Sequence, residues 1–125
     1  MKNGLKNGKG ILYYNKDNEK KRKRYEGDFK NNKIEGKGIF YFINGAKYKG
    51  DFKNNIREGK GIMNYSNGDK YDGNWKNDKR EGQGIISYNN GDKYDGNWKN
   101  NIREGQGIMN YNNGEKKKEI GKMIN

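Results

Sequence analysis

The side chains that most often perform catalysis are scarce in this chain. The sequence contains no histidine, cysteine or threonine, and its only serines are Ser66 and Ser87. No nucleophile can therefore be paired with an imidazole base, which is the usual arrangement in covalent catalysis. Instead, a carboxylate recurs at one position of a repeat, as Glu35, Glu58, Glu81 and Glu104. Because an active site breaks such symmetry, we expect a protein that is not an enzyme.

Two further motifs resemble ligand-binding loops but lack the required context. The Gly-Lys-Gly segments 36–38 and 59–61 lack the Ser or Thr that follows the lysine of a phosphate-binding loop, and no helix is predicted behind them. The acidic pairs match the spacing of no calcium loop. These pairs are Asp69 with Asp72 and Asp92 with Asp95. We therefore predict no cofactor and no metal site.

Basic residues supply most of the remaining chemistry. The formal net charge is +12, so nucleic acid, anionic lipid and acidic protein surfaces are all candidate partners. The densest cluster is Lys20, Lys21, Arg22, Lys23 and Arg24. Two lysine columns also recur, one at Lys30, Lys53, Lys76 and Lys99 and one at Lys47, Lys70, Lys93 and Lys116. The abundance of Lys, Asn, Ile and Tyr is equally typical of an AT-rich genome, so a functional and a compositional origin of the charge both stay open.

A 23-residue repeat organises all these positions. A Tyr-x-Gly-x-(Phe or Trp) segment begins at Tyr25, Tyr48, Tyr71 and Tyr94. Each copy continues with Glu-Gly-x-Gly-Ile and ends with Asn-Gly, which is the regularity of a repeat architecture. We divide the chain into a half-repeat cap with a basic insert at 1–24, four tandem repeats at 25–116 and a degenerate cap at 117–125.

Alternation within each repeat predicts strands rather than helices. Tyr71 and Trp75 fall on one face of such a strand, whereas Lys70, Asp72 and Lys76 fall on the other. Asn-Asn or Asn-Asp pairs suit a tight turn, because these residues tolerate the left-handed region. The repeats thus predict an all-β fold, an elongated single-layer antiparallel sheet of tandem hairpins in which each hairpin contacts only its neighbours.

The alternation also predicts how the strands pair. With the apolar faces on one side, Trp75 lies opposite Gly82, Gly73 opposite Gly84 and Tyr71 opposite Ile86. A three-residue loop at 89–91, with Gly91 left-handed, then places Ile86 opposite Tyr94 and Gly82 opposite Trp98. Trp98 is thereby expected between Gly82 and Gly105. We expect the glycines to make room for this indole, so that Gly82→Val is among the most damaging substitutions.

The repeat closely resembles the MORN repeat, whose pattern is Tyr-x-Gly-x-Trp followed by Gly-x-Gly and then Asn-Gly. The match covers 25–116 fully and 3–14 in part, with Phe29 and Phe52 in place of tryptophan. The resemblance implies an elongated antiparallel sheet that serves as an interaction module in cytoskeletal, ciliary and membrane-contact proteins. Binding of phosphoinositides is attributed to some members of the family.

We expect a scaffold that binds a protein partner, or a second copy of itself, through uncovered aromatic side chains on one face. The predicted contact residues are Tyr48, Tyr71, Trp75, Tyr94 and Trp98. The alternative is a peripheral membrane module in which the basic residues Lys20, Lys21, Arg22, Lys23 and Arg24 bind anionic lipid. Nucleic acid is disfavoured, because the aromatic residues lie on the face opposite most of the lysines.

The expected location is cytoplasmic, in a cytoskeletal, ciliary or membrane-peripheral setting. Without cysteine there is no disulfide framework, which favours a reducing compartment. The chain contains no apolar run of the ~20 residues that a membrane-spanning helix needs, and its first residues do not resemble a secretory signal.

Overall fold

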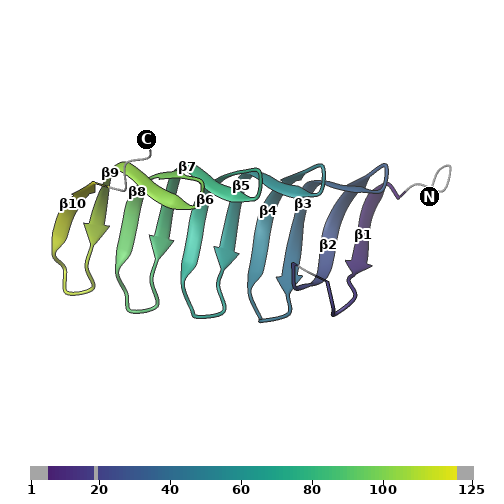
Figure 1. Cartoon of the computed structure of the whole chain (residues 1–125), viewed down its shortest axis with the longest axis horizontal. Coiled ribbons are helices and arrows are strands. Elements are labelled where there is room, and N and C mark those ends of the chain that lie inside the picture. Colours follow the sequence, from purple (N-terminus) through teal and green to yellow (C-terminus); the bar gives the residue numbers. More distant parts are fainter. Residues whose placement is uncertain (1–5, 19, 121–125) are drawn as a thin grey trace.

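The computed structural model describes residues 6–18 and 20–120, and all regular elements among them are β-strands. The strands are β1 (Gly8–Tyr13), β2 (Arg22–Lys30), β3 (Lys33–Phe42), β4 (Lys47–Lys53), β5 (Ile56–Asn64), β6 (Lys70–Lys76), β7 (Lys79–Ser87), β8 (Lys93–Lys99), β9 (Ile102–Asn110) and β10 (Lys116–Ile120). They form one sheet in the order β1 to β10, and Figure 1 shows β1 and β10 at its opposite ends. The predicted fold class is confirmed. Residues 1–5, 19 and 121–125 of the two predicted caps lie outside the described residues.

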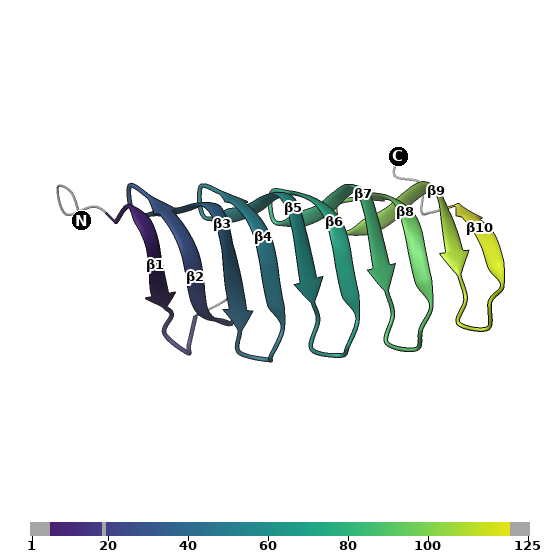
Figure 2. The same cartoon turned by 180° about the vertical axis from the view of Figure 1, so that it is seen from behind.

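Each strand pairs antiparallel with the strand that follows it in the chain. The view from behind shows the same single row of strands (Figure 2). Among the described residues, no helix is long and apolar enough to cross a membrane.

The turns follow from the residues that form them. Lys76 pairs with Lys79, so Asn77 and Asp78 alone make a two-residue turn, and both have positive φ values, 51° and 67°. This conformation suits a hairpin, and Asn and Asp are the non-glycine residues that adopt it most readily. At the opposite end of the hairpins, Gly91 has φ of 98° and its amide donates to the Tyr88 carbonyl. The predicted left-handed glycine in this loop is confirmed.

The predicted pairing between repeats is largely correct. Ile86 lies opposite Tyr94 and Gly82 opposite Trp98, as expected. Within the third repeat, Tyr71 lies opposite Ile86 and Gly73 opposite Gly84. Alternation and turn length together fixed these pairs, because a slip of one residue would have moved each apolar set to the other face.

A β-bulge in each hairpin overturns the rest of the predicted pairing. The register shifts between Gly73 and Trp75, so that Trp75 lies opposite Arg80 and not opposite Gly82. In the next hairpin Trp98 lies opposite Arg103 and not opposite Gly105. The prediction that Trp98 sits between Gly82 and Gly105 is therefore wrong on one side. A bulge leaves residues unpaired on one strand and bends it, so each hairpin bends at the same place.

The glycines make room for tyrosine rather than for tryptophan. A Cβ placed on Gly84 would overlap the Tyr71 phenol ring, and the same holds for Gly61 beneath Tyr48. Gly82 meets only the side chain of Asn74, so the expectation that its substitution displaces an indole is wrong. Its φ of 77° is what favours glycine there.

The core lies entirely on one side of the sheet. Tyrosine and Phe or Trp rings meet edge to face in a continuous chain, both within a repeat and between repeats. Tyr71, for example, lies 5.2 Å from Trp75 and 5.4 Å from Trp98, at interplanar angles of 88° and 84°. Such pairs add about 0.5–1.5 kcal/mol each beyond the burial of apolar area. Each tyrosine thus joins its own repeat to the next.

Candidate functional site

The aromatic face of the sheet is already covered by the chain itself. The five side chains predicted to contact a partner are Tyr48, Tyr71, Trp75, Tyr94 and Trp98, and none is more than 4% exposed. The expectation that they leave apolar area uncovered is therefore wrong. Their role in binding a protein stays a prediction, but their side chains offer almost no accessible surface to a partner.

Arginines cover the indoles, and sequence reasoning missed them. The Arg57 guanidinium lies 4.6 Å from the centre of the Trp75 ring. Its Nε donates to Asp78 Oδ1 at 3.1 Å and its Nη2 donates to the Asp78 carbonyl at 2.8 Å. The arginine thus lies over the next repeat's indole, where its planar group can stack and donate hydrogen bonds at once. The signal available in the sequence was the 23-residue spacing of Arg57, Arg80 and Arg103.

The basic cluster at residues 20–24 is divided between the two faces. Lys20 Nζ lies 3.9 Å from Asp78 Oδ2, and the Arg22 guanidinium lies 4.5 Å from the Phe40 ring on the aromatic face. On the opposite face, Arg24 Nε donates to Glu26 at 2.8 Å and its guanidinium stacks on Tyr41 at 3.8 Å. The five residues thus do not form one basic surface. Their proposed role in lipid binding stays a prediction.

The face opposite the aromatic core, called the back face here, carries an uncovered apolar row. The isoleucine row consists of Ile11, Ile39, Ile62, Ile85 and Ile108, one on each odd-numbered strand. Ile11, Ile85 and Ile108 are 48%, 39% and 45% exposed. On the intervening strands the paired residues are charged: Glu26, Lys49, Asp72 and Asp95. This row therefore alternates apolar and charged side chains along the sheet.

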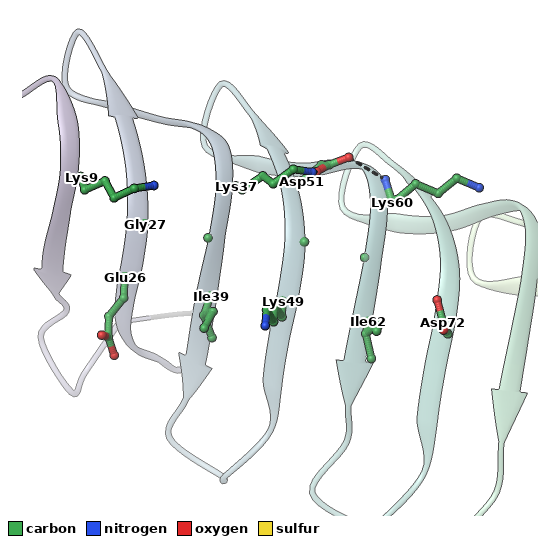
Figure 3. A pocket seen from close by; sticks show the side chains of 13 residues that line it. Lys9, Glu26, Gly27, Lys37, Ile39, Lys49, Asp51, Lys60, Ile62 and Asp72 are labelled. Atoms are coloured by element: carbon green, nitrogen blue, oxygen red, sulfur yellow. Dashed lines mark hydrogen bonds and ion pairs between the residues drawn. The ribbon is translucent and has the colours of Figure 1, made fainter.

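A shallow groove of about 570 Å³ follows the isoleucine row over the first repeats. Figure 3 shows Lys9, Lys37 and Lys60 along one side of it, and Ile39 and Ile62 along the other. Paired glycines of β2 to β5 form its floor: Gly27 with Gly38 and Gly50 with Gly61. Because these residues carry no side chain, the backbone itself forms the floor between the two rows; Gly27, Gly38 and Gly50 are half-buried and Gly61 is buried.

Carboxylates hold part of this groove in place. Asp28 accepts a hydrogen bond from Lys9 Nζ at 2.7 Å, and Asp51 accepts one from Lys37 Nζ at 2.5 Å. The hydrogen bonds from Lys9 and then from the Lys37 amide lower the pKa of Asp28. The corresponding position opposite Lys60 is Asn74, which carries no charge. The ion pairs therefore neutralise two of the three lysines on that side of the groove, Lys9 and Lys37 but not Lys60.

A second row on the back face consists of basic residues whose paired neighbours are not acidic. The lysine row consists of Arg24, Lys47, Lys70, Lys93 and Lys116, which lie on the even-numbered strands. The paired residues between them are neutral: Tyr41, Asn64, Ser87 and Asn110. All four lysines are exposed, so the predicted lysine column on the polar face is confirmed. Among the described residues, only Arg24 of this row forms an ion pair within 4.0 Å.

The part of the chain that the structure describes contains no candidate metal site. No group of three or more Asp, Glu, His or Cys side chains there is arranged to hold a metal ion. What the back face offers is a long, repetitive surface with apolar and basic rows side by side. Such a surface can bind another molecule at many weak, equivalent contacts.

Comparison with known families identifies the class of protein that this fold defines. The family model described as MORN repeat matches residues 1–19, 25–47, 48–70, 71–93 and 94–116. The chain belongs to the MORN repeat family, as the sequence resemblance indicated. MORN repeats are commonly interaction modules and are generally non-catalytic.

Comparison with solved structures supports the fold. The chain is similar to the TCP domain of SAS-4 (dCPAP) of Drosophila melanogaster, solved in complex with a proline-rich motif of Ana2 (dSTIL). The TM-score is 0.55 at 18% sequence identity, over 90% of this chain and 59% of that one. The chain thus spans well under two thirds of that structure's length, and at this identity the likeness concerns the fold alone. No curated protein matches the sequence.

Proposed function

We propose that this chain is a non-catalytic binding module that holds a protein partner on its back face, within a larger cytoplasmic assembly of the cytoskeletal, ciliary or cortical kind. The observation that carries the proposal is the uncovered isoleucine row. Its members Ile11, Ile85 and Ile108 are 39–48% exposed, whereas the aromatic residues of the opposite face are buried. Apolar side chains gathered on one accessible surface are typical of an interaction site.

The shape of the molecule supports the same proposal. A single sheet of ten strands presents the whole length of its back face to solvent. The groove beside the isoleucine row has a backbone floor, lysines along one side and isoleucines along the other, which suits an elongated protein segment better than a small compact ligand. The structural neighbour was solved with a proline-rich motif bound, so a protein segment is also the occupant of a similarly folded domain.

The experiment compares two pairs of equally exposed isoleucines. The double variant Ile85→Asp with Ile108→Asp removes two members of the row, which are 39% and 45% exposed. The control is Ile43→Asp with Ile102→Asp, which are 46% and 38% exposed and lie outside the row. Circular dichroism should show that both variants keep their β-structure.

Tagged forms of the three proteins are then used to capture partners from cells that express the chain. We expect the wild type and the control to retain the same protein and the row variant to lose it. Sedimentation of the purified chain shows whether that protein is a second copy. Retention of all partners by the row variant would refute the back face as the binding surface.

A further inference from the structure

The lysine row has a charge pattern that differs from the rest of the back face. None of the residues paired along it from Arg24 to Lys116 is acidic. On the same strands, Glu26, Asp72 and Asp95 lie two residues from Arg24, Lys70 and Lys93, and Glu26 forms an ion pair with Arg24. Beside Lys47 and Lys116, the same position holds Lys49 and Lys118 instead. Acidic residues also precede three lysines directly in the chain, as Asp69, Asp92 and Glu115. The four lysines of the row thus form no ion pair within 4.0 Å in the part of the chain that the structure describes, and their positive charge complements a partner with regularly placed carboxylates.

The spacing of the row restricts the conformation of that partner. Its cations lie on every second strand, and two strand spacings amount to about 9.6 Å. In a polyproline II chain every third side chain recurs on the same edge after about 9.3 Å. Over the four intervals of the row, the mismatch accumulates to only about 1.2 Å.

The two other regular conformations fit less well. In an α-helix side chains return to the same face after seven residues, about 10.5 Å, so the mismatch over the row reaches about 3.6 Å. In a β-strand every third side chain points to the opposite face, so successive contacts with one row are lost. The spacing of the row therefore fits the polyproline II conformation best, because its side chains recur on the same edge at every third residue.

The isoleucine row supplies a second contact for the same chain. On β7, Ile85 and Ser87 lie two residues apart on the back face, so the two rows run side by side at about 6.6 Å. A polyproline II chain has three edges, and two of them can face these two rows. One edge would place carboxylates at the lysines and the next would place apolar residues or prolines against the isoleucines.

We infer that the back face binds an extended protein segment in the polyproline II conformation with an acidic residue at every third position, laid across the strands along the lysine row. This inference rests on the function proposed above and specifies its partner. Prolines in such a segment fix the conformation before binding, which reduces the entropy lost on association.

The test uses a synthetic peptide of repeated Glu-Pro-Pro triplets, one for each cation of the row, labelled for fluorescence anisotropy. The row variant is Lys47→Gln, Lys70→Gln and Lys93→Gln. The control variant is Lys53→Gln, Lys76→Gln and Lys99→Gln, which removes the same charge from exposed lysines next to the tight turns. We expect the row variant to weaken binding at least about tenfold and the control to stay within about twofold of the wild type.

A second peptide with the same composition, but with its glutamates in one block, separates spacing from total charge. We expect it to bind more weakly than the triplet peptide, and raised salt should weaken the binding of both. The inference is refuted if the triplet peptide does not bind, if both lysine variants weaken it equally, or if the block peptide binds as tightly.

Vesicles of phosphatidylcholine with phosphatidylserine test whether the lysine row binds a membrane surface instead. Sedimentation with these vesicles that depends on the lysine row, without binding of the triplet peptide, would overturn the inference in favour of a membrane surface. If the triplet peptide fails but partner capture still depends on Ile85 and Ile108, the inference fails and the proposed function stands.

Discussion

The tyrosine that begins each repeat serves the fold through its ring and its hydroxyl. Tyr71 donates from its hydroxyl to the Asn74 carbonyl at 2.9 Å, and Tyr48 does the same to Asp51 at 3.0 Å. The hydroxyl of Tyr94 is buried, and no partner for it lies in the part of the chain that the structure describes. The bulge in this last hairpin follows the equivalent glycine, Gly96, but pairing resumes at Asn97, one residue earlier than in the hairpins before it. The same residue type therefore has two different energetic environments.

This difference predicts opposite results for one substitution. Tyr71→Phe should lower the free energy of unfolding by about 1 kcal/mol, because it leaves the Asn74 carbonyl without its donor. Tyr94→Phe should be neutral or slightly stabilising, because it removes a buried hydroxyl that has no partner. Urea unfolding followed by circular dichroism measures both values. Equal losses would show that Tyr94 has a hydrogen bond of similar strength.

The two glycines of each Gly-x-Gly segment should respond differently to alanine. Gly84→Ala places a methyl group into the Tyr71 ring, which is fixed in the core, and overpacking of this kind costs about 1–3 kcal/mol or more. In Gly82→Ala the new methyl group meets no side chain closer than 3.3 Å. Its main cost is the left-handed backbone conformation, φ of 77°, which destabilises a non-glycine residue by about 1–2 kcal/mol. We expect Gly84→Ala to be the more damaging in thermal unfolding. The reverse order would indicate that backbone conformation outweighs the tyrosine contact.

At the level of the hairpin, the tight turns are linked in series along the sheet. The Asp78 amide donates to the Arg57 carbonyl at 3.1 Å, and the Arg57 amide donates back to Asp78 Oδ1 at 2.7 Å. Asn101 and Arg80 repeat this reciprocal pair one hairpin later, at 3.1 Å and 2.8 Å. Each turn is therefore held by the hairpin before it.

Arg57 is predicted to require its planar group and not only its charge. Arg57→Lys keeps the charge but loses the stacking on Trp75 and the second hydrogen bond to Asp78, so it should cost about 1–3 kcal/mol. Arg57→Ala should cost little more than Arg57→Lys. Thermal unfolding of both variants measures the difference. A lysine variant as stable as the wild type would show that the charge of Arg57 alone accounts for its contribution to stability.

For the whole molecule, the buried tyrosines link stability to alkaline pH. Burial raises the pKa of Tyr25, Tyr48 and Tyr71 above the ordinary value of 10.0. Because the folded-state pKa is the higher one, these phenols contribute their full stability below pH 10.0, and lose it as the pH rises toward the folded-state pKa.

We therefore expect the chain to unfold cooperatively above pH 10.0, with the ultraviolet absorbance of tyrosinate and the loss of β-structure changing together. Ionisation of all ten tyrosines in one step, with unchanged circular dichroism, would contradict the protection of the core.

The sequence by itself determined the strands, the turns and most of the pairing. Its 23-residue period and alternation of side chains located β2 to β9, and Asn-Asn, Asn-Asp and Gly91 identified the turns. The lysine row was predictable for the same reason. Residues one period apart must occupy equivalent places on a sheet built from equivalent hairpins.

Only the tertiary structure decided which face is accessible. The bulge changes the partner of Trp75 from Gly82 to Arg80, and these two positions have the same parity. A pattern with a period of two cannot distinguish them, because both lie on the same face of a strand. In the folded chain Arg57 and Arg80 lie over the indoles of the hairpins that follow them, the aromatic face is buried, and the isoleucine and lysine rows are exposed.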